Sequence, residues 1–279
     1  MTTTDRPHRS PDGGDVDRSA GRATPSPGRR RDPSDAPAGG RVPWVVGVSG
    51  ASGTPYAAAV LRGLLAAELP VDLVLSRAAR LTLLDETGIA WHDADWSRPL
   101  AAWLSAPLGG NVADSAADSA ADSATDDAED SSSALADAVA ALVAVHASGN
   151  LAAPTSSGSY PTRGMIVVPA STACLAGIAL GLSKDLLQRS ADVTLKEGRR
   201  LVVVPREMPY TAATLRHMLA LHDAGTVVAA ASPGFYAGAR TAADLVDFVA
   251  GRVLDAAGVP HTLFRRWTGE LGGARRPPH

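Results

Sequence analysis

Short, almost purely aliphatic runs alternate along this chain with longer segments rich in alanine and leucine. Such runs, bounded by turn residues, are typical of buried strands, and the longer segments are typical of helices. The aliphatic runs predict strands over Trp44–Val48, Val71–Ser76, Met165–Pro169, Leu201–Pro205 and Thr226–Ala231. The segments between them predict helices over Pro55–Glu68, Ala78–Glu86, Ala173–Leu182, Leu186–Lys196, Thr211–His222 and Thr241–Ala257, and a helix-like stretch over residues 135–147.

This alternation predicts an α/β protein. Strands that are apolar along their whole length are buried on both faces, as in a parallel sheet covered by helices. Successive strands and helices then form right-handed βαβ units. Because ligands bind beyond the carboxyl ends of the strands in such sheets, we expect the distinctive loops to gather in one place.

Two low-complexity stretches interrupt the pattern. Residues 1–40 contain almost no large apolar side chains, so they cannot offset their ordering entropy and are predicted to be a disordered leader. Residues 109–134 repeat an Asp-Ser-Ala motif and are predicted to be a flexible acidic insertion. The expected organisation is a single domain over residues 41–270, with this insertion, and a flexible tail over residues 271–279.

Composition argues against several classes of protein. The formal net charge of −3 gives no case for a nucleic-acid partner, and the apolar runs are too short to span a membrane. Cys174 is the single cysteine and the N-terminus lacks the apolar core of a secretory signal, so a cytoplasmic location is expected. The seven histidines are scattered, so no metal site is expected.

The loop after the first predicted strand runs from Ser49 to Thr54 and leads into a helix. A glycine turn at a helix N-terminus leaves backbone N–H groups free beside the positive end of the helix dipole, which suits an anion. A plain strand–helix turn would have the same sequence, so this loop alone leaves both interpretations open.

Later strand ends carry related signals. Ser171 and Thr172 can cap the helix that follows them, or hold a phosphate with the same N–H groups. Arg206 and Glu207 stand between two prolines and can form either an acid–base platform or a surface ion pair. An aromatic pair that ends in Tyr236 can form a wall for a ring or prenyl group, or a packing lid.

Two further segments are candidates for ligand binding. Arg189 and Lys196 are two helical turns apart and so share one face, which fits phosphate binding or a solvated face of ion pairs. The polar segment Ser156–Ser159 can be a linker or a loop folded over a ligand. Cys174 is expected to be a small core residue rather than a nucleophile.

Taken together, the motifs resemble those of the UbiX-type flavin prenyltransferases. They are Ser49–Gly53, Pro169–Thr172, Arg189–Glu197, Val204–Pro209 and Pro233–Tyr236, in that order. The similarity runs from about Val45 to Trp267, apart from the acidic insertion. It implies a flavodoxin-like Rossmann three-layer sandwich with a parallel sheet, and a homo-oligomer, often a dodecamer, with the flavin at a subunit interface.

The resemblance also implies a reaction. A dimethylallyl group passes from dimethylallyl monophosphate to N5 and C6 of reduced FMN, and the prenylated FMN passes to a UbiD-type decarboxylase. Members of this family need no metal.

Site residues follow from the resemblance, motif by motif. The flavin site is expected to contain Gly50, Ala51, Ser52, Ser76, Ser157, Gly158, Ser159, Ser171, Thr172 and Arg189. Substrate contacts are expected from Lys196, Arg206, Tyr236, Arg252 and Trp267. The expected catalytic residues are Ser52, Glu86, Lys196 and Glu207. Glu207 is hypothesised to protonate the leaving oxygen, and Ser52 to assist proton loss from the flavin.

Two alternatives remain beside this function. A related flavin-dependent cysteine decarboxylase would need a histidine near the first helix, where this chain has only Thr54–Ala57. An FMN carrier would not need the cations Lys196 and Arg206 beyond those that hold the flavin phosphate. The chain also departs from the family at Ala173-Cys174, where Gly-Thr is common, and this changes a flavin-phosphate loop by small steps.

Overall fold

The computed structural model describes residues 42–106, 108, 125–267 and 269. The predicted leader, residues 109–124 of the predicted insertion, and the predicted tail over residues 271–279 lie outside the described residues. Within the described part of the chain, none of the helices is long and apolar enough to cross a membrane.

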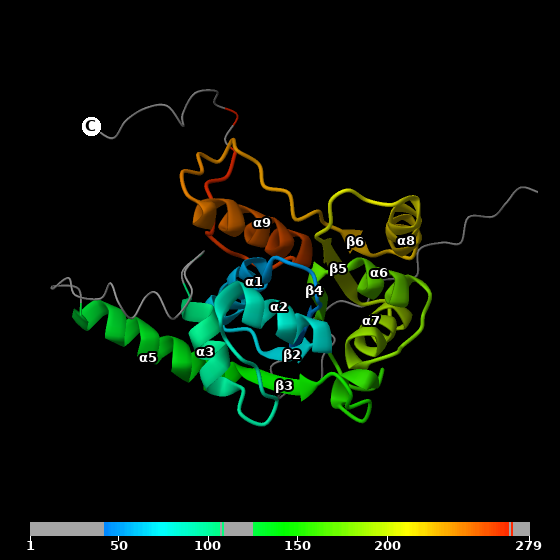
Figure 1. The fold of residues 1–279 in the computed structure, drawn as a ribbon, viewed down its shortest axis with the longest axis horizontal. Helices are drawn as coiled ribbons and strands as arrows, with labels where there is room; N and C mark the ends of the chain where they lie inside the picture. The colour runs from blue at the N-terminus through cyan, green and yellow to red at the C-terminus, as the bar shows by residue number, and fades with distance from the viewer. Residues whose placement is uncertain (1–41, 107, 109–124, 268, 270–279) are drawn as a thin grey trace, which may run out of the picture. The chain divides into compact units, whose positions relative to one another are not determined.

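Six parallel strands form the central sheet in the order β3-β2-β1-β4-β5-β6 (Figure 1). The strands are β1 (Trp44–Val48), β2 (Val71–Leu75), β3 (Val143–Ala147), β4 (Gly164–Ala170), β5 (Arg200–Pro205) and β6 (Val227–Val228). The chain moves outward in one direction from β1 and in the other from β4. The loops after these two strands therefore diverge, and they open the crevice where ligands bind in sheets of this kind.

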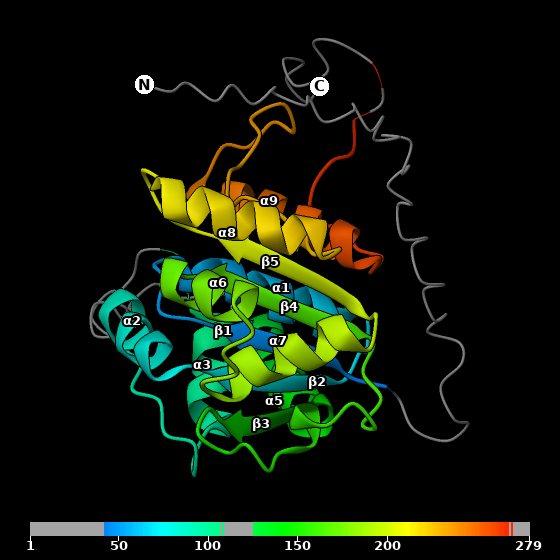
Figure 2. The ribbon, with the colours of Figure 1, turned by 90° about the vertical axis from the view of Figure 1, so that its right-hand side faces the viewer.

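Helices cover both faces of the sheet, as Figures 1 and 2 show. The helices are α1 (Thr54–Ala66), α2 (Arg77–Thr87), α3 (Ser97–Ser105), α5 (Thr125–Leu142), α6 (Thr172–Ala179), α7 (Leu186–Lys196), α8 (Ala212–Asp223) and α9 (Ala242–Ala257). A short 3₁₀ turn, η2 (Pro154–Ser156), lies beside α7.

Alternating side chains of the strands divide the core into two layers. Val46 and Val48 of β1 pack into one cluster with α1 and α9, whereas Val45 packs into the other with α6 and α7. Both clusters are built almost entirely from buried aliphatic side chains, which provide the main stabilisation. The three-layer α/β fold predicted from the sequence is confirmed.

Side-chain caps fix where several helices begin. The hydroxyls of Ser76, Ser171 and Thr211 each accept a backbone N–H from the first turn of α2, α6 and α8. Thr241 and Asp244 form the predicted capping box of α9. Each such cap contributes about 1 kcal/mol, and it sets the direction in which the loop enters the helix.

The structure differs from the predicted elements in four places. The helix expected over residues 135–147 ends at Leu142, and Val143–Ala147 is strand β3, because pairing with β2 outweighs the helix preference of its alanines. Helix α3 was not predicted, and the predicted strand Thr226–Ala231 is reduced to Val227–Val228. Residues 125–134, inside the predicted insertion, belong to helix α5.

Gly164 is required by the close approach of β4 to β5. Its φ is 151°, and a Cβ added there would lie 2.3 Å from the carbonyl oxygen of Arg200. We expect Gly164→Ala to lower the free energy of unfolding by about 2–4 kcal/mol, since backbone would have to move. Gly149→Ala is the matched control, because a Cβ there meets nothing within 4 Å. Equal denaturant midpoints for the two variants would contradict this account.

Candidate functional site

Ser49 joins the two diverging loops at the centre of the carboxyl edge. Its hydroxyl donates to the carbonyl of Pro169 (2.9 Å) and accepts the N–H of Ser171 (2.6 Å), and its own N–H donates to Pro169 (3.2 Å). The side chain is 2% exposed. The loop after β1 and the loop after β4 are thereby held together as one surface.

Glu86, in the last turn of α2, occupies the N-terminus of α1. Its carboxylate accepts the N–H groups of Gly53 and Thr54 (both 2.8 Å) and the hydroxyl of Thr54 (2.6 Å). Burial alone would raise the pKa of Glu86. Hydrogen bonds from Thr54, Ser52 and the two backbone groups outweigh burial and hold that pKa below its usual range.

Two N–H groups at the end of the glycine loop are already used within the chain. The N–H groups of Gly53 and Thr54 are not free for an external anion, because the Glu86 carboxylate already accepts them. The loop is also pressed against α2, since a Cβ added to Gly50 would lie 2.3 Å from that of Ala78. Ser52 remains exposed beside Glu86.

Arg206 and Glu207 follow β5 at the same edge. The backbone N–H of Arg206 donates to the carbonyl of Ala170 (3.3 Å). A Cβ added to Gly53 would lie 3.7 Å from Cγ of the Arg206 side chain. Nε of Arg206 is buried without a hydrogen-bond partner among the described residues. Glu207 is exposed and accepts the N–H of Met208, and the described residues show no ion pair between Arg206 and Glu207.

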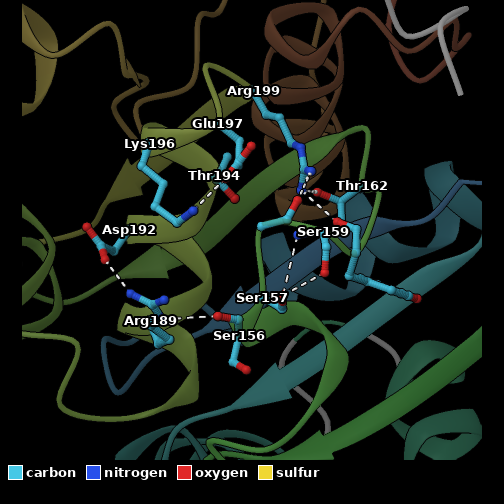
Figure 3. A network of polar contacts seen from close by, with 12 residues as sticks. Ser156, Ser157, Ser159, Thr162, Arg189, Asp192, Thr194, Lys196, Glu197 and Arg199 are labelled. Carbon is cyan, nitrogen blue, oxygen red and sulfur yellow. Dashed lines mark hydrogen bonds and ion pairs between the residues drawn. The ribbon is translucent and has the colours of Figure 1, made fainter.

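A second set of predicted residues lies along α7 (Figure 3). Arg189 donates to Asp192 (2.9 Å) and to the carbonyl of Ser156 (3.1 Å), while Lys196 pairs with Glu197. Both cations are thus engaged in ion pairs within the chain.

The polar loop Ser156–Ser159 packs directly against the end of α7. A Cβ added to Gly158 would lie 2.6 Å from Nζ of Lys196. The hydroxyls of Ser157 and Ser159 are 2.9 Å apart and exposed. Gly158 of this loop therefore lies directly beside the side chains of Lys196 and Glu197.

Lys196 and Arg206 lie near opposite ends of the strands, Lys196 at the amino ends and Arg206 at the carboxyl ends. Lys196 ends α7, just before β5 begins at Arg200, whereas Arg206 directly follows the last residue of β5. A strand of this length spans roughly 20 Å. The loops after β1, β4 and β5 gather at the carboxyl ends of the strands, as expected. Lys196 does not join them within a single chain, because α7 runs antiparallel to the strands and carries its last residue to their amino ends.

A third set gathers around α9. The ring of Tyr236 makes edge contacts with Phe248 (5.4 Å between centroids) and Trp267 (6.0 Å). Tyr236 is 48% and Trp267 56% exposed, so half of this aromatic surface faces outward. Tyr236, the second residue of the aromatic pair, both packs against other rings and offers an open face, whereas Phe235, the first, is 75% exposed.

Arg252, the predicted phosphate ligand of α9, is held by Asp255. Asp255 also accepts hydrogen bonds from Arg266 (2.8 Å) and from the buried ring of His261 (3.1 Å). Sequence reasoning missed Asp255 and His261. The spacing of Arg252 and Asp255 was visible, but nothing in the sequence places the C-terminal segment against this helix.

Other chemistry receives little support from the described residues. They contain no group of three or more His, Cys, Asp or Glu side chains placed to hold a metal ion. Burial, and secondarily the charge of Asp185, raises the pKa of the Cys174 thiol to about 12. Cys174 is therefore a core residue, as predicted, and not a nucleophile.

Comparison with known proteins identifies the family. Residues 37–254 match the Flavoprotein family model. The flavin prenyltransferase UbiX of Streptomyces coelicolor is 62% identical over 234 residues, which cover 84% of this chain and 99% of that protein. The chain belongs to the UbiX family of flavin prenyltransferases. The UbiX of Deinococcus radiodurans is 38% identical and is covered to 97%.

Solved structures of the UbiX family share this fold. A crystal structure of AnUbiX (PadA1) in complex with FMN and dimethylallyl pyrophosphate is 33% identical, with a TM-score of 0.63 over 82% of this chain and 99% of that one. A dodecameric FMN-dependent UbiX-like decarboxylase of Escherichia coli O157:H7 is 34% identical, with a TM-score of 0.62 over 82% and 100%. The flavodoxin-like fold and the prenyltransferase class predicted from the motifs are confirmed.

The low pKa of Glu86 makes its contribution to stability depend on pH. A carboxyl whose pKa is lowered by folding stabilises the protein above its unfolded pKa of about 4.5, and this contribution is lost as the pH falls through the folded value. We expect Glu86→Gln to lower the free energy of unfolding by about 1–2 kcal/mol at pH 7, because a charged acceptor is replaced by a neutral one. The difference should shrink below pH 4.

Urea denaturation at several pH values measures this effect. Asp85→Asn is the control, since Asp85 is exposed on the same helix. A Glu86→Gln difference that stays constant from pH 7 to pH 3 would show that the charge of Glu86 is not what stabilises α1.

Proposed function

We propose that this chain transfers the dimethylallyl group of dimethylallyl monophosphate to N5 and C6 of reduced FMN, giving prenylated FMN. The observation that carries the proposal is the 62% identity to a flavin prenyltransferase over almost its whole length. The solved complex of AnUbiX with FMN and dimethylallyl pyrophosphate supports both ligand classes.

The residues present fit FMN and an allylic phosphate. Nε of Arg206 is buried without a hydrogen-bond partner in the described part of the chain, and an acceptor oxygen of a ligand would satisfy it. The exposed hydroxyls of Ser52, Ser157 and Ser159 offer further partners for phosphate and ring oxygens. Reduced FMN supplies the electron-rich N5 and C6 positions that accept the prenyl group.

The side chains of the chain act mainly on the leaving phosphate. Lys196 and Arg206 stabilise the charge that builds on it as the allylic C–O bond breaks, because fixed cations favour that charge in the transition state. Glu207 is exposed in the loop after β5, between Pro205 and Pro209, and it protonates the leaving oxygen. Tyr236 and Trp267 provide the apolar wall that excludes water from the allylic cation.

A complete site requires more than one copy of the chain. Lys196 and Arg206 lie at opposite edges of one subunit, so both reach a single phosphate only when a second copy places its α7 end against the carboxyl edge of the first. We therefore propose a homo-oligomer with shared sites. The dodecameric UbiX-like protein of Escherichia coli O157:H7 supports twelve copies.

The product and its destination follow from the family. We propose that prenylated FMN passes to a UbiD-type decarboxylase, and that the reaction takes place in the cytoplasm. The single buried thiol, which can form no intrachain disulfide, is compatible with a reducing compartment.

Anaerobic incubation with reduced FMN and dimethylallyl monophosphate tests the reaction. We expect the wild-type protein to give a flavin whose mass is raised by the added five-carbon unit. Glu207→Gln should bind FMN unchanged but turn over about 10²–10⁴-fold more slowly, because general acid catalysis is lost. Asp223→Asn, exposed at the end of α8, is the control.

Two results would contradict this assignment. A protein that binds FMN but never changes its mass would be an FMN carrier. Full turnover by Glu207→Gln would remove Glu207 from the role of acid while leaving the prenyl transfer itself in place.

Mixed oligomers test the shared site. Lys196→Ala and Arg206→Ala should each be nearly inactive alone, whereas chains co-expressed in equal amounts should regain about a quarter of wild-type activity, since random assembly pairs two intact half-sites at that frequency. Mixtures of each variant with itself are the control. Absence of recovery in mixed oligomers of confirmed composition would place Lys196 and Arg206 in sites of a single chain.

A further inference from the structure

A buried carboxylate lies under the Ser157–Ser159 loop, and neither the predicted site nor the proposed reaction uses it. Asp72 is the second residue of β2 and is 3% exposed, in a strand that is otherwise entirely aliphatic. It shares a sheet face with Val74, which packs in the core layer of α7. A charged side chain there is costly unless its oxygens are hydrogen-bonded.

Both oxygens of Asp72 have a partner. Nε2 of His146 donates to Oδ1 (2.8 Å), and the hydroxyl of Tyr160 donates to Oδ2 (3.0 Å). His146 lies on the same face of the neighbouring strand, two residues beyond Ala144, which pairs with Asp72. Burial and the charge of Asp72 raise the pKa of Tyr160 to about 12, so its hydroxyl remains a donor at neutral pH.

Tyr160 connects this carboxylate to the polar loop. It is the residue directly after Ser159, and its carbonyl accepts a hydrogen bond from Arg199 (2.8 Å). Arg199 also donates to the carbonyl of Gly158 (2.8 Å). The loop is thus tied from one side by β2 and from the other by the start of β5.

An aliphatic residue at position 72 would fill β2 at least as well. Replacing a buried ionic group by apolar side chains of similar size often leaves stability unchanged or raises it, so such groups are weak stabilisers. Such a group instead fixes the positions of its partners. The Asp72 carboxylate accepts both hydrogen bonds only if strand β3, which carries His146, and the loop, which carries Tyr160, lie at fixed positions. The network therefore acts on where the loop lies more than on how stable the fold is.

We propose that Asp72, His146 and Tyr160 form a positioning triad that holds the Ser157–Ser159 loop in the conformation that binds the flavin. The inference rests on the proposed function, because it takes this loop as part of the FMN site. The triad touches no ligand itself. It lowers the entropy that the loop loses when FMN binds, and so it acts on affinity and not on the chemical step.

Tyr160→Phe removes only the hydroxyl of the triad. In the flavin-free protein we expect amide hydrogen exchange over residues 157–162 to accelerate about fivefold or more, since the loop loses one anchor. The Kd for FMN should rise roughly three- to tenfold, and the KM for FMN with it, while kcat at saturating FMN stays within about twofold. His222→Gln, exposed on α8, should change none of these quantities.

A conservative pair at His146 separates positioning from packing. His146→Gln keeps a donor for Asp72 and should retain FMN affinity, whereas His146→Leu should weaken it as Tyr160→Phe does. Unchanged loop exchange and unchanged FMN affinity in Tyr160→Phe, or wild-type affinity in His146→Leu, would overturn the triad. Failure of the wild-type protein to bind FMN would instead refute the proposed function, and the exchange measurement would still test the triad.

Discussion

The hydroxyl of Ser49 holds together the two halves of this fold where they separate. The chain leaves β1 toward one side and β4 toward the other, so the loops after these strands have no regular pairing between them. Ser49 supplies that pairing through its donor to Pro169 and its acceptor for Ser171. This bridge fixes the loop after β1, which contains Ser52, relative to the loop after β4, which contains Ser171.

Much of the fold could be predicted because its signals are local. Uninterrupted apolar runs such as Leu201–Pro205 form strands with a neighbour on each side. Because both faces of these strands are buried, they consist of apolar residues. Helix α7 was predicted with its observed bounds, since a capping Asp185 and the glycine at position 198 mark its two ends. The prediction for β3 was wrong because this strand lies at the edge of the sheet and is half exposed. Its sequence, Val-Ala-Val-His-Ala, is equally typical of a helix.

For the candidate site, the sequence could name residues of suitable chemistry but could not show where they lie in the fold. The motifs named Arg206 and Lys196 as candidate phosphate ligands. The sequence does not show in which direction helix α7 runs, and this direction separates the two residues within one chain. Glu86 was expected in the site on resemblance, but its contact with the N-terminus of α1 follows from the packing of two helices. Asp72 was visible as an acid in an aliphatic strand, and only the fold shows that Tyr160 reaches it.

The restricted side chain of Arg206 changes the entropy cost of binding an anion. An exposed arginine side chain loses much of its rotamer freedom when it binds a ligand, which costs about 0.5–1.5 kcal/mol of binding free energy. Here the burial of Nε restricts the Arg206 side chain before any anion binds. That entropy is lost during folding, so affinity at this position comes at the expense of conformational stability.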